Sequence, residues 1–277
     1  MSDQLPPPPP GAGGWAPVGP YATSLMPMPP MRSLKGLTTA LTVLFGILAL
    51  VDVGTAMARF NRAGLLDDIV DGGAVSLDMG NKLIDADESV QTLSGLHIVM
   101  ALVVLVVMII WQFRHAKNAE TLGARGGLGP GWAIGGWFIP VANLVLPMLQ
   151  MFQSSKPSDV AARVQGRRGK GAPIVIVWGI AFALGALFLA SSGALVQADD
   201  EGNLIIETVQ DVKDAASSDR SAGVGYLIFV VAAVLGLLMV RSLSARQTAA
   251  YATVAARTPA PPAPGGSTPA DTAAWAT

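Results

Sequence analysis

Residues 93–113 read LSGLHIVMALVVLVVMIIWQF and contain no Asp, Glu, Lys or Arg. A helix needs about 20 mainly apolar residues to cross about 30 Å of hydrocarbon, and this stretch is long enough to do so. Three further stretches of the same kind lie at residues 37–58, 173–196 and 222–240. Together they predict an all-α, polytopic membrane protein with four transmembrane helices.

The composition of the whole chain points to the same class. The chain is 51% hydrophobic and only 13% charged, whereas an average soluble domain carries about 25% charged residues. Its net charge of −1 gives no reason to expect a nucleic-acid partner. The absence of cysteine excludes disulfides and thiolate chemistry, and two histidines are too few for a His-rich metal site. We therefore expect no cofactor and no metal.

A fifth apolar stretch, residues 131–152, differs because Pro140 and Pro147 interrupt it. Each proline removes a backbone hydrogen bond and clashes with the preceding turn, and freed backbone groups are costly in lipid unless protein or water satisfies them. We expect two short helical pieces around Asn143, whose side chain is suited to cap a freed helix end. The segment is then either a re-entrant hairpin or a helix along the inner interface. It serves either as a pore or substrate element or as a structural staple.

Lysine and arginine residues favour four crossings over five. If residues 131–152 enter and leave on the same side, most of the 18 basic residues lie on the side of the two termini. Five crossings would divide these residues more evenly. We therefore predict a multi-pass protein of the cell membrane with both termini in the cytoplasm. Arg59 and Arg62 lie at the outer end of the first span and are exceptions to this rule.

The two outer loops contain most of the 19 acidic residues. In the first loop we expect short helices at residues 63–70 and 80–89, and in the second loop a helix at residues 204–216. Residues 1–36 are rich in proline and glycine, and residues 244–277 are rich in alanine, threonine and proline. Such segments cannot bury a core, so we expect disordered cytoplasmic tails on both sides of a transmembrane domain at residues 37–243.

Asp52 is the only acid inside a predicted span, and His97 lies at a matching depth in the second span. A charged side chain in hydrocarbon costs about 2.5–3.5 kcal/mol on insertion scales, so it usually faces a partner or a water-filled cavity. We expect Asp52 and His97 to face each other or share a cavity, with Tyr226 at a comparable depth. The pair is either a proton- or ion-responsive site or an interhelical hydrogen bond.

Residues 137–140 read Trp-Phe-Ile-Pro, with Asn143 and Pro147 following. This motif resembles the signature of a bacterial membrane family, the domain of unknown function 4328. The family resembles this chain in its four spans, in the position of the motif between the second and third spans, and in a proline-rich cytoplasmic leader. The resemblance covers about residues 37–243. It implies a membrane location and no assigned activity.

Two functions follow from these features. The first is a non-enzymatic membrane scaffold or envelope interaction protein, and the second is a small oligomeric transporter or channel that uses residues 131–152 and the Asp52/His97 region. We expect that the protein is not an enzyme, because the sequence contains no recognisable set of a nucleophile and a base. The expected partners are the lipid bilayer, further copies of the chain, and a cytoplasmic Pro-binding protein. This protein would bind the proline run of residues 6–10. The alternative is that the run is only a spacer. The candidate polar sites are Asp52, His97, Trp137, Pro140, Asn143 and Pro147.

Overall fold

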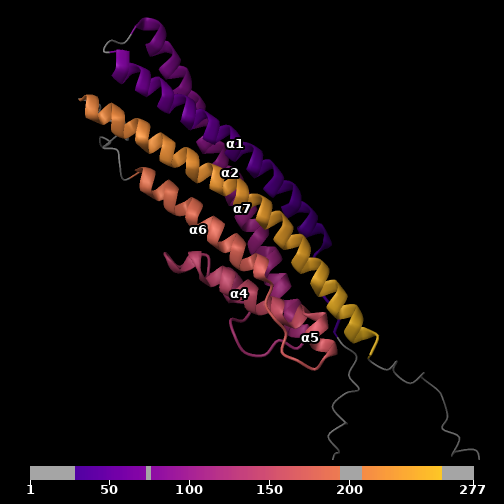
Figure 1. Cartoon of the computed structure of the whole chain (residues 1–277). Helices are drawn as coiled ribbons and strands as arrows, with labels where there is room; N and C mark the ends of the chain where they lie inside the picture. Colours follow the sequence, from indigo (N-terminus) through magenta and orange to yellow (C-terminus); the bar gives the residue numbers. More distant parts are fainter. Residues whose placement is uncertain (1–28, 73–75, 194–207, 258–277) are drawn as a thin grey trace, which may run out of the picture. The chain divides into compact units, whose positions relative to one another are not determined.

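A computed structural model describes residues 29–72, 76–193 and 208–257 of the chain. Within these ranges the chain is helical and contains no strand, as the sequence predicts. Pro30–Val254 form one compact unit. The elements in chain order are α1 (Lys35–Gly72), α2 (Leu77–Thr121), α3 (Trp132–Gly135), η1 (Ala142–Leu144), α4 (Leu146–Ser155), η2 (Lys156–Ser158), α5 (Val160–Val164), α6 (Pro173–Gly193) and α7 (Val209–Ala255) (Figure 1).

Four of the described helices, α1, α2, α6 and α7, are long and apolar enough to cross a membrane. Large apolar side chains such as Leu50, Leu102 and Leu187 lie exposed on their outer surfaces, which is the pattern that a lipid solvent requires. We call the end of the bundle where α1 turns into α2 the outer end, and the opposite end the inner end. The start of α7 also lies at the outer end (Figure 1).

At the outer end, α1 and α2 continue well past their spans as one helical hairpin. Residues 63–70 and 80–89 are helical, as the sequence predicts, but they belong to the long helices α1 and α2, since α1 runs unbroken to Gly72 and α2 begins at Leu77. Ser76 caps α2, since its hydroxyl accepts a hydrogen bond from the Met79 amide at 3.1 Å. A small apolar core supports the extension, formed by Ala63, Leu66, Ala215 and Ala216.

The helix predicted at residues 204–216 of the second outer loop overlaps the start of α7, at Val209. Residues 204–207 lie outside the described ranges. From Val209 onward the predicted segment is therefore the first part of α7 and not a separate loop helix.

At the inner end, order extends beyond the predicted transmembrane domain of residues 37–243. α7 runs on to Ala255, because Ser244 and Gln247 hydrogen-bond to other helices. On the N-terminal side the Arg32 amide donates to Oδ1 of Asn118 at 2.8 Å, so the predicted tail of residues 1–36 is ordered at its end. The other parts of the two predicted tails, residues 1–28 and 258–277, lie outside the described ranges.

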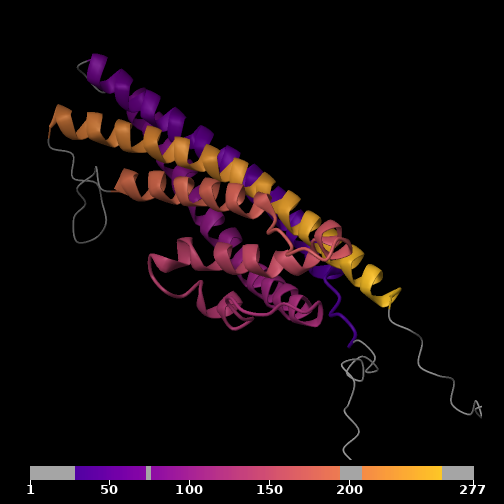
Figure 2. The same cartoon turned by 60° about the horizontal axis from the view of Figure 1, so that its bottom comes forward.

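Residues 131–152 turn back on themselves and form only short helices, none of them long enough to cross a membrane, and we call this segment the re-entrant hairpin. The Leu128 amide donates to Oε1 of Gln153 at 2.7 Å, which places the two flanks of the segment side by side. Between these flanks the chain forms α3, η1 and α4, and α4 runs along α6 (Figures 1 and 2). The ring of Trp137 lies 6.4 Å from that of Phe182, near the middle of α6, so the hairpin reaches into the bundle.

The two prolines divide the hairpin as expected, but Asn143 does not cap a helix. Pro147 lies in the first turn of α4, where a missing backbone N–H leaves no bond unmade. The residues that precede η1 and α4 are Val141 and Val145, and neither cap has a side-chain hydrogen bond. Val141 has φ of 64°, an uncommon conformation for a β-branched residue, at the turn after Pro140.

Close helix packing depends on glycine at Gly236 of α7. A Cβ atom built there would lie 2.8 Å from Cζ of Phe45 and 3.0 Å from Nε1 of Trp178. Small residues let helix backbones approach closely in membranes. Gly236 therefore allows α1, α6 and α7 to meet around one aromatic cluster.

Candidate functional site

Asp52 of α1 and His97 of α2 lie in contact in the interior of the bundle. Nδ1 of His97 is 2.5 Å from Oδ1 of Asp52, and both residues are buried. The Tyr226 and Phe229 rings of α7 pack against the imidazole, with centroids 5.1 and 5.7 Å away. The prediction that Asp52 and His97 meet is confirmed, while the role of the pair stays a prediction.

The second carboxylate oxygen of Asp52 has no hydrogen-bond partner within the described part of the chain. Asp52 is fully buried, and an unpaired buried acceptor loses its interaction with water without replacement. Such an atom is a natural contact for a ligand that brings a hydrogen-bond donor.

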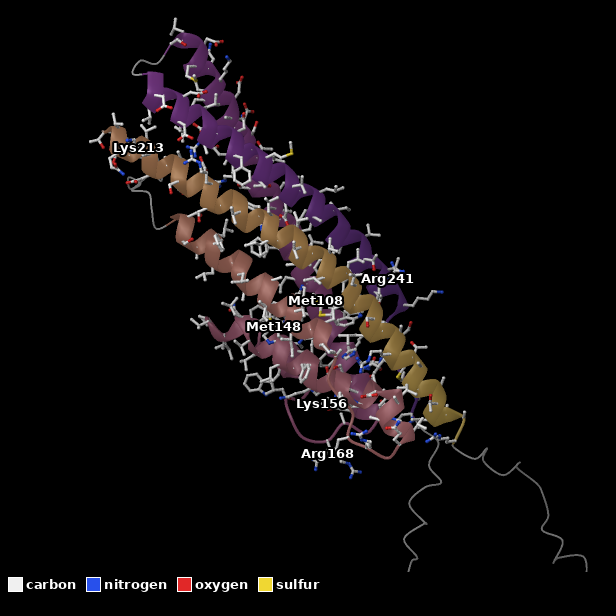
Figure 3. The ribbon with its side chains drawn as sticks, in the orientation of Figure 1. Met108, Met148, Lys156, Arg168, Lys213 and Arg241 are labelled. Atoms are coloured by element: carbon white, nitrogen blue, oxygen red, sulfur yellow. The ribbon has the colours of Figure 1, made fainter. Side chains whose placement is uncertain are left out.

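A cavity of about 520 Å³ adjoins the Asp52–His97 pair. We call it the intramembrane pocket. Its walls come from four long helices and from the re-entrant hairpin, and they are mostly apolar and aromatic. Asp52, His97 and Tyr226 contribute its polar groups on one side, and Trp137 and Asn143 contribute those of the hairpin. Met108 of α2, which also lines the pocket, belongs to the same buried apolar cluster as Met148 of α4 (Figure 3).

Four of the six predicted site residues line this pocket: Asp52, His97, Trp137 and Asn143. The two prolines do not, and act through the backbone. The Pro147 carbonyl accepts a hydrogen bond from Gln112, and the Pro140 carbonyl accepts one from the Ala142 amide at 2.7 Å. The structure thus brings together the two regions that the sequence could name only separately.

Gln112 at the inner end of α2 holds the hairpin in place. Its Nε2 donates to the Pro147 carbonyl at 3.0 Å and to Oε1 of Gln150 at 2.9 Å, and its Oε1 accepts from Nε1 of Trp137 at 3.0 Å. Gln112 is fully buried. The sequence does not identify this residue, because a glutamine near the end of an apolar run is expected to face water.

Neutral groups also tie α1, α2 and α7 together at the inner end. Nε1 of Trp111 donates to the hydroxyls of Thr38 and Ser244, which lie 2.7 Å from each other. Asn118 donates to Oε1 of Gln247, whose Nε2 donates to the His115 carbonyl. We call these bonds, together with those of Gln112, the inner ties.

Charged groups tie the same helices at the outer end. Asp219 of α7 is only 1% exposed and accepts from Arg59 at 2.9 Å and from Arg62 at 2.8 Å, both on α1. Arg62 also pairs with Asp87 of α2. We call this cluster the outer ties. Asp219 and Asp87 neutralise the two arginines at this end of the first span.

One serine and one histidine lie close enough to resemble a nucleophile and its base. Oγ of Ser154 is 3.2 Å from Nδ1 of His115. However, Ser154 donates its only hydroxyl proton to the Met151 carbonyl at 3.1 Å, so the imidazole acts as donor toward it. This arrangement fixes α4 against α2 and does not activate the serine. Among the described residues no cluster of His, Asp and Glu is suited to hold a metal ion.

Comparison with known proteins gives one match. The sequence model of the family described as Domain of unknown function (DUF4328) matches residues 76–256. This range runs from the cap of α2 through the end of α7, and it includes the re-entrant hairpin but not α1. No curated protein and no solved structure matches the chain.

Proposed function

The chain belongs to the family of Domain of unknown function (DUF4328), and we propose that it is a non-enzymatic integral membrane protein whose bundle serves as a fixed scaffold. One observation carries this proposal: polar ties join α1, α2 and α7 at both ends of the bundle. A scaffold requires one persistent arrangement of its helices.

The ties make movement of the helices costly. Separating α1 from α7 at the outer end would leave Asp219, Arg59 and Arg62 without partners, and breaking a buried ion pair costs about 3–5 kcal/mol. Separating α7 from α1 and α2 at the inner end would leave the Trp111 indole and the Gln247 amide without these partners. A transporter that works by alternating access opens one end of the bundle at a time. The cost of breaking the outer ties and the cost of breaking the inner ties both oppose such movement.

We also propose that both termini, and with them the inner end, lie in the cytoplasm. Lys156 and Arg168 lie at the inner end, whereas Lys213 lies at the outer end (Figure 3). Since lysine and arginine favour the cytoplasmic side of a membrane, the excess of these residues on the side of the two termini supports this orientation.

Single cysteines test this orientation, since the chain has none of its own. Gly129→Cys and Lys156→Cys place exposed thiols on the two flanks of the hairpin, and Asp78→Cys places one on the α1–α2 tip. In intact cells an impermeant maleimide should label only the tip, and the flanks should react after the membrane is opened. Labelling of one flank alone would mean that the hairpin crosses the membrane. Labelling of both flanks would mean that the orientation is inverted.

A scaffold needs a partner, and we propose that the proline-rich leader docks a cytoplasmic Pro-binding protein. Deleting residues 1–28 leaves the bond between Arg32 and Asn118 intact. In-cell photo-cross-linking from the inner end of the full chain should capture a protein that the shortened chain no longer captures. Equal capture by both chains would contradict this part of the proposal.

The second candidate is a small transporter or channel, and the intramembrane pocket is the observation that favours it. The pocket joins the Asp52–His97 pair to Trp137 and Asn143 of the broken hairpin, the two regions that such a function would use. Four helices enclose little volume, so this candidate would act as a homo-oligomer.

Distances between spin labels separate the two candidates. The exposed pairs Asp85→Cys with Lys213→Cys and Glu120→Cys with Thr248→Cys report on α2 and α7 at the outer and inner ends. In lipid vesicles a scaffold gives one narrow distance distribution for each pair. Two populations that shift in opposite directions at the two ends would favour the transporter.

A further inference from the structure

We propose that the intramembrane pocket binds a lipophilic primary amine from the bilayer, with its ammonium group on the free oxygen of Asp52. This proposal stands whether the bundle is a fixed scaffold or a transporter, because it concerns binding and not passage. The volume of the intramembrane pocket, about 520 Å³, lies within the range of about 300–1,000 Å³ that is typical of small-molecule sites.

The mouth of the pocket indicates where the ligand comes from. Ile98 and Leu102 line the pocket and are 59% and 57% exposed, and both lie within the apolar part of α2. The opening beside them therefore faces hydrocarbon and not water. A ligand that enters there must first dissolve in the membrane, which selects molecules with a long apolar part.

The polar side of the pocket indicates the chemistry of the head group. Asp52 is the only acid among the lining residues, and no lysine or arginine lines the pocket within the described ranges. His97 occupies one carboxylate oxygen, and the other has no partner. When the Asp52 carboxylate is ionised and the imidazole is neutral, one negative charge lies in an apolar environment, and an ammonium group would neutralise it while donating to the free oxygen.

Aromatic side chains strengthen the case for a cation. Tyr226 and Phe229 pack against the His97 ring and line the pocket, so both rings lie close to the place that we assign to the head group. Aromatic faces attract cations within about 6 Å. Further along the pocket, Phe182 and Trp178 stack on each other and offer an apolar surface to the chain of the ligand.

Binding of radiolabelled dodecylammonium to the full chain in nanodiscs of neutral lipid tests the proposal, with protein-free nanodiscs to subtract partitioning into lipid. We expect saturable binding that unlabelled dodecylammonium displaces and dodecanoate does not. Binding no greater than to empty nanodiscs, or equal displacement by dodecanoate, would overturn the proposal.

Asp52→Asn keeps the shape of the side chain and removes its charge. We expect this variant to weaken dodecylammonium binding about tenfold or more, since a charge-assisted hydrogen bond is lost. Unchanged affinity in a folded Asp52→Asn protein would contradict the assigned head-group position.

A second variant keeps the test valid if Asp52→Asn does not fold. Leu102→Trp fills the mouth of the pocket from an exposed position, and Leu50→Trp places the same side chain on the lipid-facing surface of α1 outside the pocket. Binding should fall about tenfold or more in Leu102→Trp and stay unchanged in Leu50→Trp. Equal binding by the two variants would place the amine elsewhere and overturn the proposal.

Discussion

At the outer end of the bundle α1 and α7 meet through charges, whereas at the inner end the same two helices meet through hydroxyl and indole groups. The outer ties bury Asp219 between two arginines, and the inner ties join Thr38, Ser244 and Trp111 without any ionised group. The difference shows that a count of arginines along the sequence does not equal the charge that each end presents. Asp219 and Asp87 together neutralise Arg59 and Arg62.

Removal of Asp219 is the most direct way to break the outer ties. Asp219→Ala leaves Arg59 and Arg62 without their shared partner, and we expect a loss of about 3 kcal/mol in the free energy of unfolding. Unfolding by SDS in mixed micelles measures this loss. The matched control is Asp78→Ala, since Asp78 forms an exposed pair with Lys82 and exposed ion pairs contribute little to stability. Equal losses in the two variants would show that burial does not strengthen the outer ties.

Gln112→Leu tests the inner ties in the same assay. The change leaves the Trp137 indole, the Pro147 carbonyl and Gln150 without their partner, and we expect a loss of about 2 kcal/mol. Hydrogen exchange at residues 131–152 should be faster in this variant than in the unchanged protein. Thr248→Val, at an exposed position of α7, should change neither quantity. Slow exchange of the hairpin in Gln112→Leu would mean that α6 alone holds it.

Salt separates the two ends without any mutation. Raising the ionic strength to 1 M shortens the screening length to about 3 Å, which weakens partly exposed ion pairs and leaves neutral hydrogen bonds unchanged. Arg59 is 22% exposed, so the outer ties should lose less than about 1 kcal/mol. Hydrogen exchange should rise at residues 59–66 and 212–219 and stay constant around residues 111–118. A uniform rise at both ends would contradict the assignment.

The smallest expected effect concerns Asp159, a capping residue at the inner end. Hydrogen bonds from the Lys170 and Ala162 amides lower the pKa of this carboxylate below its usual 3.8. A lowered pKa in the folded state means that the stabilisation is complete above the unfolded pKa and is lost as the pH falls through the folded one. Exchange at the start of α5 should therefore rise only below pH 3.8. In Asp159→Asn this pH dependence should disappear, and its persistence would assign it to another group.

The sequence predicts the four long apolar helices and one polar pair well, for the same reason. In an apolar helix each polar residue stands out, and the matching depths of Asp52 and His97 are enough to bring them together. The turn-back of residues 131–152 also follows from Pro140, Pro147 and the distribution of basic residues. The sequence does not predict that this segment lines the pocket, because that contact depends on how far Trp137 reaches along α6.

The residues that the sequence did not identify lie at the ends of the spans. There a polar side chain such as Gln112, Asn118 or Gln247 is expected to face water, and only tertiary contacts show that it is buried. Asp219 is similarly hidden among many acids of an outer loop. Hydropathy does not locate the ends of the long helices, because it marks where a helix leaves the apolar layer and not where the helix stops. α1 and α7 continue because Leu66 and Ala216 still pack together there.

The unbroken extension of α1 past its span has a mechanical consequence. α1 contains 38 residues, or about 57 Å at 1.5 Å per residue, against about 30 Å of hydrocarbon. Its residues 59–72 alone span about 20 Å, and α2 returns alongside them as a continuous helix. The outer parts of α1 and α2 therefore form a rigid projection. A partner that binds at its tip is held at a fixed distance above the lipid head groups.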